Sequence, residues 1–209
     1  MFTPRWFMPY DVLIMLVMTA VSMAIAIYAL RGFRWVKERS LYYLFLAFVL
    51  LAIGFFANGL TLGYDFLQRT GDPSNFQPMA FIDLGYAIFF LCSIVAYGIL
   101  AFAYFRNVRE ASLAAAIFGM FLTSSIPLIE CVIIVLLFAL VFAQIIHLSI
   151  HRSRYSMIVC GSFMLILASH IMMLMSDMAH QDYYVFGKLL QLGAFVMLLA
   201  MLLKLRGPE

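Results

Sequence analysis

The chain is dominated by long runs of apolar residues separated by short polar segments. A helix of about 20 apolar residues crosses the hydrocarbon core of a bilayer, and six runs reach that length: 9–30, 40–63, 79–105, 127–150, 155–177 and 183–204. Each run predicts one transmembrane helix. Since these runs occupy nearly all of the chain, we expect a single all-α membrane domain over residues 1–209.

A weaker seventh helix is predicted between the third and fourth of these runs. The segment 111–125 is apolar but short, and it is bounded by Arg109 and Pro127. Without a helix there, the chain would have to cross the membrane as coil, with its backbone polar groups unsatisfied in lipid. We therefore expect a seven-helix bundle with a short fourth helix.

The positions of the basic residues test this seven-helix count, because short cytoplasmic loops are enriched in Lys and Arg. With seven helices, ten of the 13 basic residues fall on one side: Arg31, Arg34, Lys37, Arg39, Arg106, Arg109, Arg152, Arg154, Lys204 and Arg206. Arg5 and Arg69 fall on the other side, and Lys188 lies within a helix. The predicted topology is a multi-pass protein of the cell membrane with its N-terminus outside and its C-terminus inside.

The overall composition supports a membrane location. Hydrophobic residues make up 66% of the chain and charged residues 11%, whereas a soluble domain carries about 25% charged residues. Cys92, Cys131 and Cys160 occur singly within apolar runs, so no disulfide framework or CxxC redox motif is predicted. The first run is followed, not preceded, by basic residues, and we expect it to remain attached rather than act as a cleaved signal peptide.

The two halves of the chain resemble each other weakly. MPYDVLIMLVM, a basic loop, a helix and LGYAIFFL in the first half correspond to IPLIECVIIVL, a basic loop, a helix and FGKLLQLG in the second. Two three-helix units joined by one short helix form a 3+1+3 plan with a parallel internal repeat. In transporters built from such repeats, the solute site lies between the repeats.

Two motifs carry a family resemblance. The first helix opens with Pro9, Tyr10 and Asp11, and the last contains the pattern YxxGxxLxLxxFxxLL at Tyr184, Gly187, Leu190, Leu192, Phe195, Leu198 and Leu199. With these motifs the chain resembles a group of small archaeal multi-pass membrane proteins, a resemblance that implies no activity. The 3+1+3 plan is similar to that of SWEET-type sugar and PnuC-type vitamin transporters, although the Pro-Gln pair of the former and the tryptophan motif of the latter do not occur.

Polar residues inside the predicted helices are the candidate functional residues, because polar groups are costly in hydrocarbon and often mark solute or proton pathways. Six of them fall toward the outer ends of their helices and form the predicted substrate-binding site: Asn58, Asp83, Glu130, His170, Lys188 and Gln191. We expect Lys188 to pair with Asp83 or Glu130. Tyr184 and Gln191, at i−4 and i+3, share its helix face. In the alternative interpretation, Lys188 and Asp11 snorkel to the interface and Glu130 caps its helix.

Two other segments suggest metal sites. In SHIMMLMSDMAH, one helical face would carry His170, Met173, Asp177 and His180, while the other methionines spread over the far side. A Cu(I) site needs several converging soft ligands, so packing is the favoured role for these methionines. His147 and His151 have an i, i+4 spacing that can hold zinc, but no third ligand is evident. We therefore predict no catalytic residues, no bound metal and no cofactor.

The leading functional hypothesis is a small membrane transporter or solute-binding protein that takes a small polar or zwitterionic solute. The alternatives are a membrane-embedded sensor or accessory subunit, which would act through a partner membrane subunit, and a metal-dependent membrane enzyme. The lipid bilayer is the expected partner of the apolar surface. No sequence feature suggests nucleic-acid binding, a phosphate-binding loop or a paired-carboxylate site.

Overall fold

A computed structural model of the protein describes residues 4, 6–71, 80–105, 126–150, 154–176 and 180–205. In this part of the chain the ordered elements are all helices: α1 (Met8–Val36), α2 (Arg39–Gly71), α3 (Ala80–Phe105), α5 (Ile126–Ile150), α6 (Arg154–Ser176) and α7 (Asp182–Leu205). All six are long and apolar enough to cross a membrane. Six helices are therefore confirmed at the positions of the six predicted apolar runs. The predicted short helix over residues 111–125 lies outside the described residues.

The first two helices are longer than their apolar runs. α1 continues through the basic segment to Val36, and Lys37 then ends it in a left-handed conformation with φ 56° and a backbone hydrogen bond to Phe33. α2 continues past residue 63 to Gly71, so the first residues after the predicted run 40–63 are helical. The reason is the same in both places. Arg, Lys, Gln and Asp are tolerated in helices, and the predicted ends at residues 30 and 63 marked where apolar character stops rather than where the helix stops.

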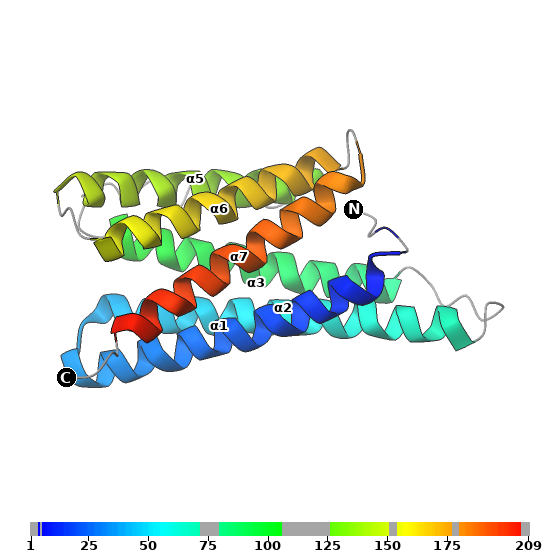
Figure 1. Ribbon diagram of the computed structural model, residues 1–209, viewed down its shortest axis with the longest axis horizontal. Coiled ribbons are helices and arrows are strands. Elements are labelled where there is room, and N and C mark those ends of the chain that lie inside the picture. The colour runs from blue at the N-terminus through cyan, green and yellow to red at the C-terminus, as the bar shows by residue number, and fades with distance from the viewer. Residues whose placement is uncertain are drawn as a thin grey trace.

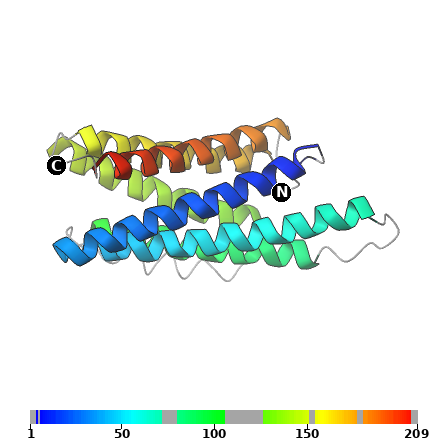
Figure 2. The ribbon, with the colours of Figure 1, turned by 60° about the horizontal axis from the view of Figure 1, so that its bottom comes forward.

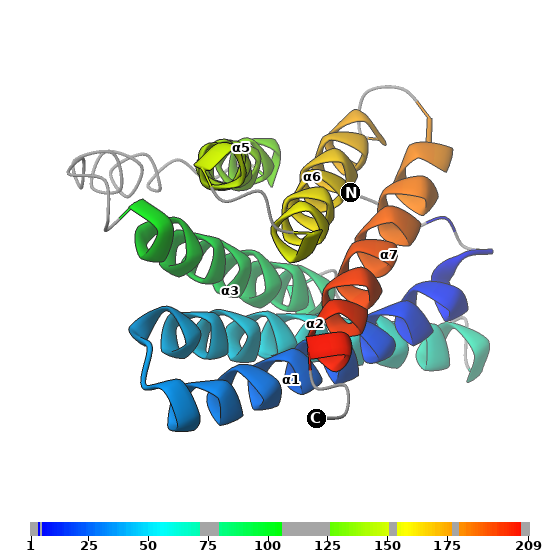
Figure 3. The ribbon, with the colours of Figure 1, turned by 60° about the vertical axis from the view of Figure 1, so that its left-hand side comes forward.

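The helices form a closed ring. Along the described chain each helix packs against the next, and α7 packs against α1. α1, α2 and α3 follow one another side by side, and α5 and α6 continue the arrangement beyond α3 (Figure 3). α7 runs obliquely from the end of α6 toward α1 (Figure 1). The buried side chains therefore lie inside a ring of six helices.

The bundle has two distinct ends. We call the end where α1 begins the Asp11 end, and the end where α1 turns into α2 the Trp35 end. The starts of α3, α5 and α7 lie at the Asp11 end together with the ends of α2 and α6 (Figure 1). The two chain termini consequently lie at opposite ends of the bundle (Figure 2), and α3 and α5 run in the same direction although they follow each other among the described helices.

Aromatic side chains fill the centre of the ring. Phe55 of α2 packs against Phe89 of α3 and Phe195 of α7, with ring centroids 5.4 and 5.3 Å apart. Phe48 contacts the same Phe195 ring from one side. Large apolar side chains are also exposed along the outer faces of the helices, for example Leu91 and Phe138. Outer faces of this kind suit contact with lipid chains, which are as apolar as the side chains themselves.

Candidate functional site

A set of polar side chains is buried within the ring, toward the Asp11 end. Asn58, Glu130, His170, Lys188 and Gln191 of the predicted site are all at most 2% exposed. They come from four helices, α2, α5, α6 and α7. α6 packs against both α5 and α7, and Phe55 of α2 meets Phe195 of α7 in the interior. Five of the six predicted site residues thus lie inside the bundle.

Asp83 is the exception. It lies in the first turn of α3 and its side chain is exposed. It lies at the same end of the bundle as the buried polar residues, but its side chain does not enter the interior. The predicted pairing of Lys188 with Asp83 is therefore wrong.

Asp11 is the carboxylate that Lys188 contacts. Lys188 Nζ lies 3.8 Å from Asp11 Oδ1, and both side chains are buried. The Tyr184 hydroxyl donates a hydrogen bond of 2.6 Å to Asp11 Oδ2. The interpretation that Asp11 and Lys188 snorkel to the interface is wrong, because their partners hold them inside the bundle. We call Asp11, Tyr184 and Lys188 the lysine cluster.

Besides Asp11, a methionine sulfur and two aromatic rings surround the Lys188 ammonium. Met15 Sδ lies 3.9 Å from Lys188 Nζ, and the ammonium lies 5.7 Å from the centroid of the Phe89 ring and 5.2 Å from that of Tyr184. Aromatic faces attract cations by their quadrupole. These contacts partly replace the hydration that the ammonium loses on burial.

A second buried pair lies between α5 and α6. His170 Nδ1 is 2.9 Å from Glu130 Oε2, and the Tyr97 ring of α3 meets the imidazole edge-on, with centroids 6.0 Å apart. The alternative prediction that Glu130 caps its helix end is not what the contacts favour, because its carboxylate faces inward to His170. We call Tyr97, Glu130 and His170 the histidine cluster.

The two clusters are electrostatically connected. Lys188 interacts with the Glu130 carboxylate as well as with Asp11. Gln191, one turn after Lys188, lies beside the Tyr97 hydroxyl, and the two groups make no hydrogen bond with each other. Gln191 therefore lies where α7 faces the histidine cluster.

Asn58 of α2 lies close to Gln191 in its position along the length of the bundle. Phe55, one turn before Asn58, packs against Phe195, and Gln191 lies one turn before Phe195 on α7. Because α2 and α7 run in opposite directions, both of these one-turn steps lead toward the Asp11 end. Asn58 and Gln191 consequently occupy neighbouring levels in the interior.

Many polar atoms of this site have no protein partner. Within the described part of the chain, no hydrogen bond is made by Asn58 Oδ1 and Nδ2, Gln191 Oε1 and Nε2, Glu130 Oε1, His170 Nε2 or the Tyr97 hydroxyl. A buried polar group without a partner costs about 1 to 3 kcal/mol. Several such groups close together indicate that water or a solute supplies hydrogen bonds there.

Tyr97 and Asp11 are the site residues that the sequence-based prediction missed. Tyr97 lies in the middle of a strongly apolar run, where an aromatic residue gives no polar signal. Asp11 was noted but assigned to the interface, because it lies near the start of its helix. The presence of an unpaired basic residue, Lys188, was the signal that a buried carboxylate had to exist.

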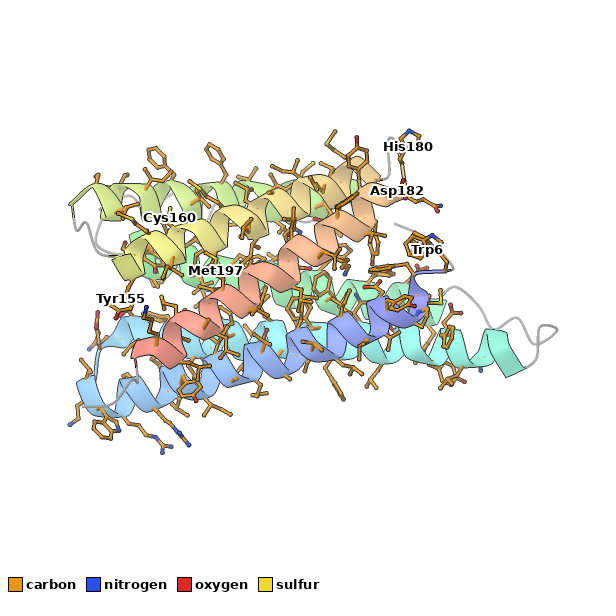
Figure 4. All side chains as sticks on the ribbon, viewed as in Figure 1. Trp6, Tyr155, Cys160, His180, Asp182 and Met197 are labelled. Carbon is orange, nitrogen blue, oxygen red and sulfur yellow. The ribbon has the colours of Figure 1, made fainter. Side chains whose placement is uncertain are left out.

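The two segments considered as metal sites are only partly described. Among the described residues, no group of three or more His, Cys, Asp or Glu side chains is placed to hold a metal ion. α6 ends at Ser176, so His180 is not on the same helical face as His170. It lies exposed near Asp182 at the α6–α7 turn (Figure 4). Asp177, His151 and the His147 side chain lie outside the described residues.

Comparison with known proteins gives no family. No protein-family model, no curated protein and no solved structure matches the chain. The resemblance to small archaeal membrane proteins therefore stays a prediction, and the function has to be argued from the site alone.

Proposed function

We propose that the protein is a small multi-pass membrane transporter or solute-binding protein, and that Asn58, Glu130, His170, Lys188 and Gln191 contact the solute. The observation that carries this proposal is the group of buried polar atoms without protein partners. Asp83 is not part of the proposed site, because it is exposed.

The chemistry of the site supports a small polar or zwitterionic solute. Two amide side chains offer both donors and acceptors. Glu130 Oε1 is a free acceptor suited to an amine, while Lys188 and His170 can face an anionic group. A polar solute needs such partners in hydrocarbon, since each of its own unsatisfied groups would be costly there.

The proposed topology has seven crossings in the cell membrane, with the N-terminus outside and a 3+1+3 arrangement of helices. The parallel directions of α3 and α5 support an odd number of crossings, as do the opposite positions of the two termini. The Trp35 end carries exposed Arg31, Arg34, Lys37 and Arg39, which favours the cytoplasmic side for that end. Epitope tags at the two termini should be accessible from opposite sides of the membrane; accessibility from the same side would contradict seven crossings.

The test of function uses substitutions that should not harm the fold. Asn58→Leu and Gln191→Met replace unpartnered amides by apolar groups of similar shape, a change that is nearly neutral or stabilising in a buried site. Gln144→Met is the matched control, because Gln144 is also buried with an unpartnered Nε2 but lies about 21 Å along α5 from Glu130 at 1.5 Å per residue.

The measurement is the melting temperature of the purified protein in detergent, screened against amino acids, amines and other small polar compounds. A ligand at a hundred-fold excess over its Kd stabilises the folded state by about 2.7 kcal/mol. We expect at least one compound to raise the melting temperature of the wild type and of Gln144→Met, and to lose this effect in Asn58→Leu, Gln191→Met, Lys188→Met and His170→Ala. A screen without any stabilising compound, or equal shifts in all variants, would overturn the proposal.

The second candidate function, a sensor or accessory subunit, is favoured by the exposed tip between α1 and α2. Trp35 is 89% exposed there, and the basic residues around it are exposed as well. This hypothesis expects a partner membrane subunit that co-purifies with the wild type and is lost when Arg31 and Arg34 are changed to Gln. Isolation of the protein alone under mild extraction would contradict it.

A further inference from the structure

The formal charges of the two buried clusters do not balance. Asp11 and Lys188 form a neutral pair. Glu130 adds one negative charge, and His170 compensates it only when the imidazole carries an additional proton. The buried site thus has a net charge of −1 with a neutral imidazole and 0 with one more proton. A net charge in a site of low dielectric is costly unless it is paired.

The geometry of the Glu130–His170 pair indicates where this proton resides. When the carboxylate is ionised, the imidazole Nδ1–H donates to Glu130 Oε2 at 2.9 Å. In a neutral imidazole this tautomer leaves Nε2 as a bare acceptor. Nε2 is buried and has no partner among the described residues. It is therefore the atom at which a proton can be gained or lost without breaking the bond to Glu130.

We propose that the Glu130–His170 pair is a binding site for one exchangeable proton, taken up at His170 Nε2. In the step, the Nε2 lone pair accepts a proton from hydronium, which leaves as water, or from a protonated group of a bound solute, which is left as its conjugate base. The positive charge on the ring is balanced by the Glu130 carboxylate. A proton requires no cavity, which agrees with the tight packing of Tyr97 against the ring. That this proton is the coupling ion of transport rests on the function proposed above.

The groups that face His170 agree with this assignment. α5 contributes Glu130 and α3 contributes the Tyr97 ring. From α7, Lys188 interacts with the Glu130 carboxylate, and Tyr184 donates its hydrogen bond to Asp11 rather than to the histidine cluster. Lys188 is itself engaged by Asp11 of α1, and so it cannot fully compensate Glu130. The imidazole of His170 is the remaining group that can change the net charge of the site by one unit, by gaining or losing a proton.

The experiment is NMR of isotopically labelled imidazole nitrogens, with the protein in lipid nanodiscs. His170→Gln identifies the His170 signals by their loss. Glu130→Gln is the test variant, because a glutamine carbonyl still accepts the Nδ1–H hydrogen bond but carries no charge to balance an imidazolium. Asp83→Asn is the charge control, since Asp83 is exposed, and the exposed His180 serves as an internal reference.

We expect wild-type His170 to change from one to two protonated ring nitrogens as the pH is lowered, because imidazole is the side chain whose charge most readily switches in proteins. The change should persist in Asp83→Asn and be absent in Glu130→Gln, whose ring should keep one N–H throughout. A wild-type ring with one N–H at every pH, or an unaltered change in Glu130→Gln, would overturn the proposal. If the change occurs but no solute binds, the proton site stands and its coupling role fails. If a solute binds although the His170 ring keeps one N–H at every pH, the function proposed above stands and the proton site fails.

Discussion

Lys188 Nζ lies 3.8 Å from Asp11 Oδ1 inside the bundle, and this ion pair joins α7 to α1. The contact between these two helices closes the ring, and the ion pair lies at this contact. The same pair borders the proposed solute site. Stability and function therefore depend on shared residues, and the following experiments are chosen to separate them.

Asp11→Asn should destabilise the protein. It leaves the Lys188 ammonium buried without its carboxylate, and breaking a buried ion pair from one side costs about 3 to 5 kcal/mol. The free energy of unfolding, measured by denaturant titration in mixed micelles, should fall by an amount of this order. The double variant Asp11→Asn/Lys188→Met should recover most of the loss, and Asp83→Asn should change little because Asp83 is exposed. Equal stability of Asp11→Asn and the wild type would show that the pair does not hold α7 against α1.

Tyr184→Phe should destabilise the protein through the same carboxylate. The variant removes only the hydroxyl that donates to Asp11 Oδ2 at 2.6 Å, and a hydrogen bond to a charged group contributes about 1.5 to 3 kcal/mol. Thermal unfolding of Tyr184→Phe, Asp11→Asn and the double variant should give non-additive losses, because the two residues share one interaction. Tyr10→Phe is the control, since Tyr10 is 60% exposed. Fully additive losses would mean that the hydroxyl acts independently of Asp11.

The sequence predicts the depth of a polar residue in the membrane better than the direction in which it points. Lys188 and Asp83 were both assigned correctly to the Asp11 end, because their distance along each helix follows from the apolar runs. Their rotation about the helix axes does not follow, since the hydrophobic residues of these helices surround them on all sides. As a result Asp83 or Glu130 was predicted as the partner of Lys188, whereas the carboxylate nearest to its ammonium is Asp11.

The ends of the helices, too, are predicted by hydrophobicity only in part. The four helices α3, α5, α6 and α7 begin and end within one residue of their predicted runs. α1 and α2 extend beyond their runs to Val36 and Gly71, because a helix can continue outside hydrocarbon as long as its residues tolerate helical geometry. Hydrophobicity predicts where a helix meets the membrane interior, and turn-forming residues predict where it stops. Gly71, followed by Asp72 and Pro73, is such a stop signal.

Gly187→Ala should weaken the packing of α7 against α6. A Cβ at Gly187 would lie 2.9 Å from the Ser169 carbonyl oxygen and 3.1 Å from Met173 Cγ, so the helices would have to move apart near Lys188. Overpacking of this kind costs about 1 to 3 kcal/mol. Gly193→Ala on the same helix is the control, because its Cβ would meet no atom within 4 Å and alanine is the better helix former. The melting temperature should fall for Gly187→Ala and stay constant or rise for Gly193→Ala; the same response in both would contradict the close approach.

The Trp35 end should select anionic lipid head groups. Trp6 and Trp35 are the two tryptophans of the chain. Trp6 precedes α1 and Trp35 lies one residue before its end, and the 29 residues of α1 span about 43 Å at 1.5 Å per residue. Because this exceeds the hydrocarbon thickness of about 30 Å, the two indoles report on opposite interfaces. Near an anionic surface each Lys or Arg contributes about 1 kcal/mol of attraction, and Trp35 is surrounded by exposed basic residues, including Arg31 and Arg34.

Fluorescence quenching by brominated lipids in nanodiscs measures this selectivity. In Trp6→Phe, brominated phosphatidylglycerol should quench Trp35 more strongly than brominated phosphatidylcholine. Changing Arg31 and Arg34 to Gln in that background should remove the preference, and raising the salt concentration should reduce it because exposed charges are screened. In Trp35→Phe the remaining Trp6 should be quenched equally by both lipids. Equal quenching of Trp35 by both lipids would mean that the exposed basic tip faces something other than a lipid surface, which would favour the partner-subunit hypothesis.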